Sequence, residues 1–237
     1  MNLLFLLIEV ILSYIILLFV YKKYKEEGIY IWIIVILLIS SIMSIKSIEI
    51  NNVNIALGIG VSSSIYIANN ILIQKKGTEH MKKITTIMLI ISFIFICLLI
   101  LSSGLPISDY NNILNLMYNN VILSNIKFII ANMISIISAI YINNFLYYEL
   151  RKVKNKIWIS NIFSSLIFAF VESIIFVLIT KFINGSLYIV MMTIVIRYIL
   201  RLIILIIGTD VIYIANNFRE RLWILWEQEK MNWLVII

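Results

Sequence analysis

The sequence predicts an all-α polytopic integral membrane protein with about seven transmembrane helices. Hydrophobic residues make up 62% of the 237-residue chain and charged residues only 13%, with a mean hydropathy of +1.05. Soluble domains are near 45–50% apolar and about 25% charged. The apolar residues gather in runs of about 20, the length at which a helix crosses the hydrocarbon core of a bilayer. Once these runs are subtracted, too little chain remains for a soluble catalytic domain.

The apolar runs divide the chain into one transmembrane helical domain, residues 1–217, and a short tail, residues 218–237. The tail combines charged residues with Trp223, Trp226 and Trp233, so it is expected to form a cytoplasmic amphipathic helix at the membrane interface. The seven expected spans are residues 3–21, 29–45, 54–73, 84–102, 121–147, 160–181 and 188–214.

Basic residues are concentrated in every second loop, which predicts the orientation of the chain. The alternate loops carry only Lys46 and Lys181. Because cytoplasmic loops carry an excess of Lys and Arg, the N-terminus is expected outside and the C-terminus inside. The basic residues of the rich loops and the tail are Lys22, Lys23, Lys25, Lys75, Lys76, Lys82, Lys83, Arg151, Lys152, Lys154, Lys156, Arg219, Arg221 and Lys230.

Several classes of function are disfavoured by the same composition. The formal net charge of +7 follows from the topology, so no nucleic-acid partner is expected. The chain has no GxxxxGK[ST] phosphate loop, and His80 and Cys97 are its only histidine and cysteine. No metal site or cofactor is therefore predicted. An enzyme is not expected either, because no Ser/His or Cys/His pair and no paired carboxylates at matched depth are present.

Glu172 is the most informative single residue, because it lies in the middle of the apolar run 161–180. An acidic side chain near the bilayer midplane costs roughly 2.5–3.5 kcal/mol on insertion scales and is by default a candidate functional residue. Arg201, in the next run, lies at about the same depth and is the expected partner. A purely structural Glu172–Arg201 bridge remains an alternative to a binding site.

Arg197 lies one helical turn before Arg201 and creates an excess of positive charge. Two buried guanidinium groups facing one carboxylate leave one cation uncompensated. Either Arg197 snorkels outward, or the site expects an anionic or strongly accepting partner. Arg201 is expected to be the inward residue of the two.

Small residues predict which faces of the spans pack together. In lipid, close helix packing relies on small side chains at helical spacing. On the sixth span, Ser165 and Ala169 precede Glu172 by seven and three residues and so share its face, leaving space beside the carboxylate. On the third span, one stripe recurs every four residues: Ala56, Gly60, Ser64 and Ala68.

Polar residues on the fifth span form a second candidate surface. Asn132, Ser135 and Asn143 lie on one stripe with Ala139, and Lys127 lies nearer the outer end. Interhelical hydrogen bonds without a ligand are the alternative explanation for each of these side chains.

With the spans placed, the chain resembles the queuosine-precursor transporters of bacteria and archaea, also called putative vitamin uptake transporters. The resemblance runs from about residue 20 to residue 215 and depends on the order and spacing of short motifs. Residues 70–77, Asn-Ile-Leu-Ile-Gln-Lys-Lys-Gly, occupy the place of the family's Asp-Ile-Leu-x-Glu-x-Tyr-Gly motif. The pair Glu172-Ser173 matches Asp-Thr or Asp-Ser in relatives, and Arg201 stands where Lys is common. Further matches are residues 24–30, residues 46–49, Leu57-Gly58, residues 147–152, Ser164 and Tyr213.

The chain also departs from the family pattern at several charged positions. Asn70 and Gln74 replace an Asp and a Glu, Asn143 replaces an Asp, and Lys127 replaces an Arg. The family comparison makes the first span, residues 3–21, peripheral to the shared core. These replacements remove negative charge while mostly keeping side-chain size, so Glu172 is the main acid left to bind a solute.

The resemblance implies import of a 7-deazaguanine queuosine precursor or a related vitamin-like solute through the cell membrane. A carboxylate such as Glu172 can accept from the ring's N1–H and exocyclic amine together, and Arg201 can meet the carbonyl oxygen. Neutral amides in place of acids favour an uncharged ring over the cationic aminomethyl precursor. The predicted substrate-binding residues are Glu172, Arg201, Asn70, Asn132, Asn143, Lys127 and Ser165.

The sequence is compatible with three functions. The first is a stand-alone importer, in which protonation of Glu172 couples transport to a proton gradient. The second is the substrate-binding membrane subunit of a multi-subunit vitamin uptake system, and the third is a non-transporting accessory protein. Small size suits the first two, and a homo-oligomer is compatible with all three.

Overall fold

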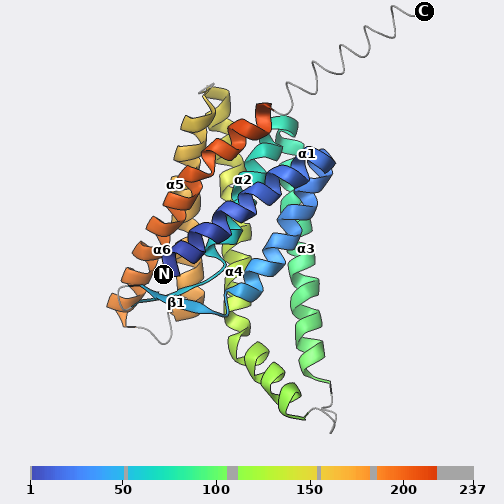
Figure 1. The fold of residues 1–237 in the computed structure, drawn as a ribbon, viewed down its shortest axis with the longest axis vertical. Helices are drawn as coiled ribbons and strands as arrows, with labels where there is room; N and C mark the ends of the chain where they lie inside the picture. Colours follow the sequence, from blue (N-terminus) through green and yellow to red (C-terminus); the bar gives the residue numbers. More distant parts are fainter. Residues whose placement is uncertain (1, 51–52, 106–111, 154–155, 182–185, 218–237) are drawn as a thin grey trace, which may run out of the picture.

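The computed structural model describes residues 2–50, 53–105, 112–153, 156–181 and 186–217. The fold is a bundle of long helices with one short β-hairpin at one end (Figure 1). Within the described residues, five helical stretches are long and apolar enough to cross a membrane, which confirms a multi-pass helical membrane protein. In chain order the elements are α1 (Asn2–Met43), β1 (Ser47–Ile50), β2 (Val53–Ala56), α2 (Ile59–Lys76), α3 (Thr78–Ser103), α4 (Asn112–Val153), α5 (Ile157–Lys181) and α6 (Leu187–Ile207).

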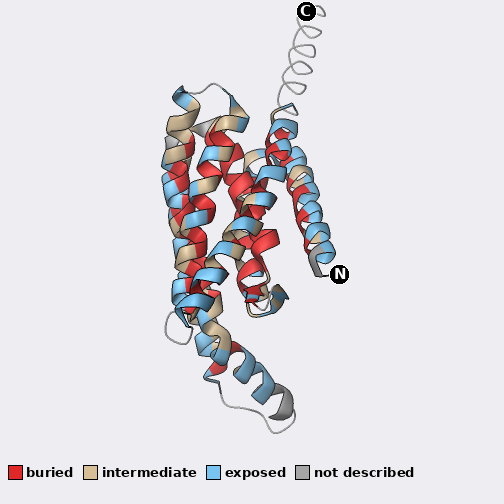
Figure 2. Cartoon of the chain, turned by 90° about the vertical axis from the view of Figure 1, so that its left-hand side faces the viewer, coloured by how far each residue is buried: buried red, intermediate tan, exposed pale blue. Residues whose placement is uncertain are grey.

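Helix α1 consists of two arms that meet at a kink. Lys25 has φ 52° and ψ −132°, a conformation outside the helical region, so the helix reverses there. The two arms correspond to the first two expected spans, residues 3–21 and 29–45. In Figure 1 the first arm runs obliquely across the bundle, and in Figure 2 much of that arm is coloured as exposed. Its exposed side chains are apolar, including Phe5, Ile8 and Phe19, as expected for a surface in contact with lipid.

The β-hairpin corrects the expected start of the third span. Residues 53–56 form a strand antiparallel to Ser47–Ile50, where a helix from residue 54 was expected. Apolar and polar residues alternate in both segments, a pattern that favours strand over helix. Gly58 then starts α2 with φ +89°, and a Cβ atom there would lie 2.5 Å from the backbone oxygen of Ser40. Only glycine fits this turn without strain.

Helix α2 is the central element of the bundle, and its residues from Ile59 to Ile73 are all buried. The small residues expected to pack do so against α1. A Cβ atom on Gly60 would lie 3.1 Å from Val10, and Trp32 Nε1 donates a hydrogen bond of 3.1 Å to Ser64 Oγ. Ala56, the first residue of the expected stripe, instead belongs to β2. Being surrounded by protein explains why α2 tolerates serines and asparagines that a lipid-facing helix would exclude.

Helix α6 approaches α2 closely at its end, where Gly208 interrupts the predicted span 188–214. A Cβ atom on Gly208 would lie 2.7 Å from both Ile67 and the hydroxyl of Tyr14. The Tyr14 hydroxyl donates to the backbone oxygen of Ile204 at 2.9 Å. Gly208 therefore allows α1, α2 and α6 to meet at one point.

The bundle has two ends, which we name for later reference. The end that carries β1 and β2 is the hairpin end, and the opposite end is the amide end. The amide end includes the α1 kink, the turn at Gly77 and the end of α4, since Lys75 lies over the Tyr21 ring and Gln74 donates to the Tyr147 hydroxyl (Figure 1). Figure 2 shows buried residues along the inner faces of the helices and exposed ones outside. The expected tail, residues 218–237, lies outside the described residues.

Candidate functional site: a buried glutamate between two arginines

Glu172 is completely buried and is held by two arginines of α6. Arg197 Nη2 donates to Glu172 Oε1 at 2.5 Å, and Arg197 Nε donates to Oε2 at 3.3 Å. Arg201 Nη2 lies 2.8 Å from the same Oε1 atom. Ser135 Oγ on α4 adds a longer hydrogen bond of 3.4 Å to Oε1. The predicted pairing of Glu172 with Arg201 is therefore confirmed, but the closer partner is Arg197.

The inward position of Arg197 corrects the expectation that Arg201 alone points inward. The Arg197 side chain is only 1% exposed and that of Arg201 is 0% exposed, so neither snorkels. Residues four apart on a helix share a face, which places both guanidinium groups against α5. Aromatic rings support both cations: the Arg197 guanidinium carbon lies 3.7 Å from the centre of the Phe176 ring, and that of Arg201 lies 5.8 Å from Phe168.

Arg201 also ties the cluster to the central helix. Its Nη1 atom donates to Ser62 Oγ at 3.0 Å and to Ser63 Oγ at 3.3 Å. Two consecutive serines near the start of α2 thus provide neutral acceptors for Arg201, which shares the Glu172 carboxylate with Arg197. The sequence offered no clear signal for these serines, because short polar side chains are common in packed transmembrane helices.

The cluster carries one more positive charge than negative charge, and some of its donors lack partners. Glu172 contributes one negative charge, whereas Arg197 and Arg201 contribute two positive ones. Arg197 Nη1 and Arg201 Nε are buried without any hydrogen-bond partner among the described residues. A buried donor without a partner costs roughly 1–3 kcal/mol, and more when it is charged. Such donors are complementary to a hydrogen-bond acceptor or an anion.

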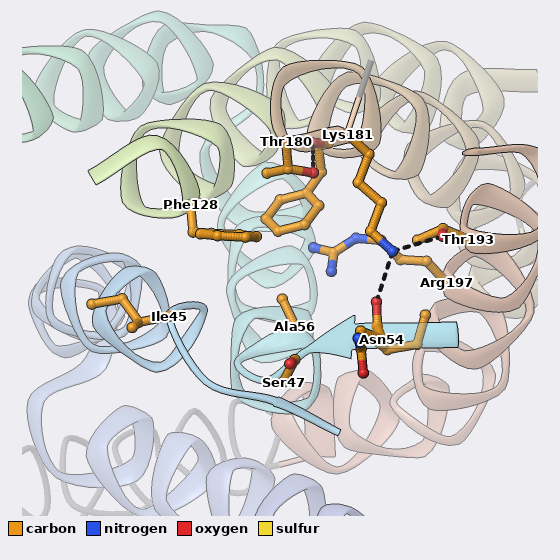
Figure 3. A pocket seen from close by; sticks show the side chains of 11 residues that line it. Ile45, Ser47, Asn54, Ala56, Phe128, Thr180, Lys181, Thr193 and Arg197 are labelled. Atoms are coloured by element: carbon orange, nitrogen blue, oxygen red, sulfur yellow. Dashed lines mark hydrogen bonds between the residues drawn. The ribbon is translucent and has the colours of Figure 1, made fainter. Parts of the chain in front are cut away.

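A cavity of about 210 Å³ opens at the hairpin end and reaches Arg197. In Figure 3 the Arg197 guanidinium group points toward Phe128 and Ala56. Phe176 lines the same cavity, so two phenyl rings, from α4 and α5, border the space beside the cation. The remaining lining residues are Ile45, Ser47, Asn54, Ile55, Thr180, Lys181 and Thr193.

Lys181 links three of the elements that line this cavity. Its Nζ atom donates to the backbone oxygen of Asn54 at 3.1 Å and to Thr193 Oγ1 at 3.0 Å, as the dashed lines in Figure 3 show. These bonds join the end of α5 to β2 and α6. In the sequence Lys181 marked only an outer loop, so its place at the cavity was missed.

A chain of neutral amides joins four helices at the amide end. Asn143 Nδ2 donates to Asn70 Oδ1 at 2.8 Å, and Asn70 Nδ2 donates to Asn161 Oδ1 at 2.9 Å. Asn161 Nδ2 continues to Thr209 Oγ1 at 2.8 Å, while the Tyr66 hydroxyl donates to the Asn161 backbone oxygen at 3.0 Å. Asn70 and Asn143 were predicted to bind substrate, whereas Asn161 was missed because it stands at the edge of its apolar run. We call Asn143, Asn70, Asn161 and Thr209 the amide chain.

The remaining predicted site residues occupy separate places. Asn132 is buried on α4 and donates to Ser40 Oγ and Ser41 Oγ, both at 3.1 Å, and its Oδ1 atom has no partner among the described residues. Ser165 is buried and donates to the Ile162 backbone oxygen within its own helix at 2.8 Å. Lys127 is exposed and does not line the cavity. The structure therefore brings together Glu172 and Arg201 but not Lys127.

This architecture, with several apolar helices and a charged cluster buried at the end of a cavity, is that of a polytopic membrane protein with an interior polar site. The sequence model of the putative vitamin uptake transporter family matches residues 56–215. Because this match covers most of the chain, the protein belongs to that family. The family expected from the sequence is thus confirmed, although the motifs before residue 56 lie outside the match. No curated protein and no solved structure matches the chain.

Proposed function

We propose that the protein imports a planar 7-deazaguanine, the class of ring found in queuosine precursors, across the cytoplasmic membrane of a bacterium or archaeon. The observation that carries this proposal is the buried Glu172 held by Arg197 and Arg201, with an unpaired Arg197 donor beside a cavity. Family membership supplies the general activity, uptake of a small molecule. The chemistry of the cluster supports the choice of substrate.

A guanine-like edge complements both parts of the cluster. Its N1–H and exocyclic amine are adjacent donors for a carboxylate, and its carbonyl oxygen is an acceptor for a guanidinium group. Arg197 now occupies both oxygens of Glu172. We therefore infer that the ring displaces Arg197 from the carboxylate and that the released guanidinium binds the carbonyl oxygen. Glu172 keeps Arg201 as its ionic partner, and Arg197 exchanges its ion pair for a charge-assisted hydrogen bond to the neutral carbonyl oxygen.

The cavity suits a flat ring in size and lining. Its volume of about 210 Å³ lies below the range of roughly 300–1,000 Å³ typical of sites for drug-sized ligands, which favours a small bicycle. Phe128 and Phe176 border it, and aromatic side chains stack on the faces of bases. Arg197 in the lining also disfavours a cationic ring substituent, in keeping with the preference for an uncharged precursor inferred from Asn70 and Asn143.

The orientation in the membrane completes the proposal. We place seven spans in the bilayer, counting the two arms of α1 separately, with the hairpin end outside, because the basic loops lie at the amide end. The cavity then faces the exterior, and the amide chain closes the cytoplasmic side. Import requires the amide chain to open while the hairpin end closes, which is alternating access about a fixed charged centre.

The test is thermal stabilisation of the purified protein by a panel of deazaguanines, purines and vitamins. We expect the 7-cyano ring to raise the unfolding temperature of the wild type and to have no effect on Glu172→Gln. Glu149→Gln removes an exposed carboxylate that pairs with Lys152, and it should respond like the wild type. Equal shifts in the wild type and in Glu172→Gln would remove Glu172 from the site. If no deazaguanine shifts the wild type, the proposed substrate is wrong.

A protein that binds the ring but does not carry it alone would instead be a substrate-binding subunit. Uptake would then appear only together with separate energising subunits. Absence of both binding and uptake would favour an accessory protein.

A further inference from the structure

We propose that Lys181 reads the charge of the solute's ring substituent, so that the outer cavity binds an anionic or acceptor substituent and rejects a cationic one. This inference rests on the proposed function and deepens it, because it assigns a selectivity role to a residue outside the Glu172 cluster. It also extends the expected solutes from neutral rings to rings that carry a carboxylate.

The position of Lys181 is the first support. Arg197 and Lys181 line the same cavity, and Arg197 connects that cavity to Glu172. In a 7-deazaguanine the C7 substituent lies next to the C6 carbonyl, so a ring whose carbonyl oxygen meets Arg197 places its substituent against the neighbouring lining. Lys181, at the end of α5, belongs to that lining, because its Nζ atom bonds to Thr193, one helical turn before Arg197 on α6 (Figure 3). The substituent therefore comes near the ammonium group.

The hydrogen bonds of Lys181 are the second support. The Nζ atom is fixed by two neutral acceptors, the Asn54 backbone oxygen and Thr193 Oγ1. These bonds orient the ammonium group without neutralising its charge. A lysine nitrogen carries three donors, so one more remains for a ligand.

The charge of the lining is the third support. None of the eleven side chains that line the cavity is acidic, whereas two are cationic. Glu49 on β1 is exposed and does not belong to the lining. Arg197 is also part of the Glu172 cluster, in which Glu172 and Arg201 balance each other and Arg197 supplies the excess positive charge. A solute in the cavity therefore meets two cationic side chains, and no carboxylate belongs to the lining.

The expected change in affinity follows from the half-buried position of Lys181. Charges near a protein surface interact with an effective dielectric constant near 20, so changing the substituent from cation to anion should alter affinity by at least about tenfold. The neutral nitrile, an acceptor without charge, should fall between the two.

The experiment compares three ligands that differ only in the ring substituent: 7-carboxy-, 7-cyano- and 7-aminomethyl-7-deazaguanine. Dissociation constants are measured by calorimetry on the full-length protein in detergent. For the wild type we expect affinity to fall in that order, with at least about tenfold between the first and the last. Lys181→Gln should bring the carboxy and aminomethyl rings to within about threefold, and Lys181→Glu should reverse their order.

Two further variants keep the result decisive. Lys181→Arg retains the charge and should retain the wild-type order, so a collapse of order in Lys181→Gln cannot come from local disorder alone. Lys23→Gln removes an exposed lysine beside the α1 kink, at the amide end, and should change nothing. A wild type that binds all three rings equally, or an unchanged order in Lys181→Gln, overturns the role of Lys181 but leaves the proposed substrate standing. Failure of all three rings to bind the wild type overturns both.

Discussion

The hairpin end and the amide end of this bundle are built from the same helices but satisfy their polar groups differently. At the hairpin end, Arg197 keeps a buried donor without a partner beside an open cavity. At the amide end, Asn70 and Asn161 pass hydrogen bonds from helix to helix without any charge. The amide end also keeps buried atoms without a partner among the described residues, Asn143 Oδ1 and Arg151 Nη1, so the hairpin end is distinguished by an unpaired cation that lines a cavity.

The largest loss of stability should follow from removing the Glu172 carboxylate, which neutralises one of the two arginines. Glu172→Leu leaves two buried guanidinium groups without an anion, and breaking such a pair costs about 3–5 kcal/mol. The free energy of unfolding in detergent should fall by that amount. Glu149→Leu, which removes an exposed partner of Lys152, should cost less than about 1 kcal/mol. Similar losses for the two variants would contradict a buried charge centre at Glu172.

The next largest effect should come from interrupting the amide chain. Asn161→Leu strands the Asn70 amide and the Thr209 hydroxyl, and each buried polar group left unpaired costs about 1–3 kcal/mol. We expect a loss of about 2–3 kcal/mol in the free energy of unfolding. Asn125→Leu is the matched control, because Asn125 bonds only within its own helix, to Val121. If both variants lose equally little, the amide chain does not hold this end together.

A smaller effect is expected from the turn that joins the hairpin to the central helix. Gly58→Ala places a Cβ atom 2.5 Å from the Ser40 oxygen at a residue with φ +89°. Backbone strain of this kind costs about 1–3 kcal/mol. Gly104→Ala, at an αR position whose nearest neighbour is 3.6 Å away, should leave the unfolding temperature unchanged. A Gly58→Ala protein as stable as Gly104→Ala would show that this turn does not constrain the hairpin.

The smallest effect on stability should come from Lys181 itself. Its hydrogen bonds to Asn54 and Thr193 lie at a half-buried site, so Lys181→Gln should change the free energy of unfolding by less than about 1 kcal/mol. A change in the order of ligand affinities in Lys181→Gln would then come from altered ligand recognition and not from loss of stability. A loss above about 2 kcal/mol, a large value for a single substitution, would instead give Lys181 a structural role.

The sequence predicted the class of fold and the central pair because depth in the membrane can be read from position in an apolar run. Glu172 and Arg201 lie at matching depth, and the structure joins them. The face of a helix on which a side chain lies is harder to predict. Lys127 precedes Asn132 by five residues, which places it about 140° away around the helix from the polar stripe. That angle explains why Lys127 is exposed while Asn132 is buried.

Other features depend on contacts that sequence patterns do not encode. The outward option for Arg197 could not be rejected without knowing that Phe176 and Glu172 surround its guanidinium group. The hairpin was missed because a short apolar run fits a helix or a strand equally well. Lys181 was interpreted as a topological marker, since nothing in the sequence shows that β2 folds back onto α5.

Uptake of the 7-cyano ring into liposomes that contain only this protein tests the central claim most directly. We expect wild-type protein to take up the ring and Glu172→Gln to take up none, while Glu149→Gln behaves as the wild type. Uptake by Glu172→Gln at the wild-type rate would show that the buried carboxylate plays no part in carrying the solute.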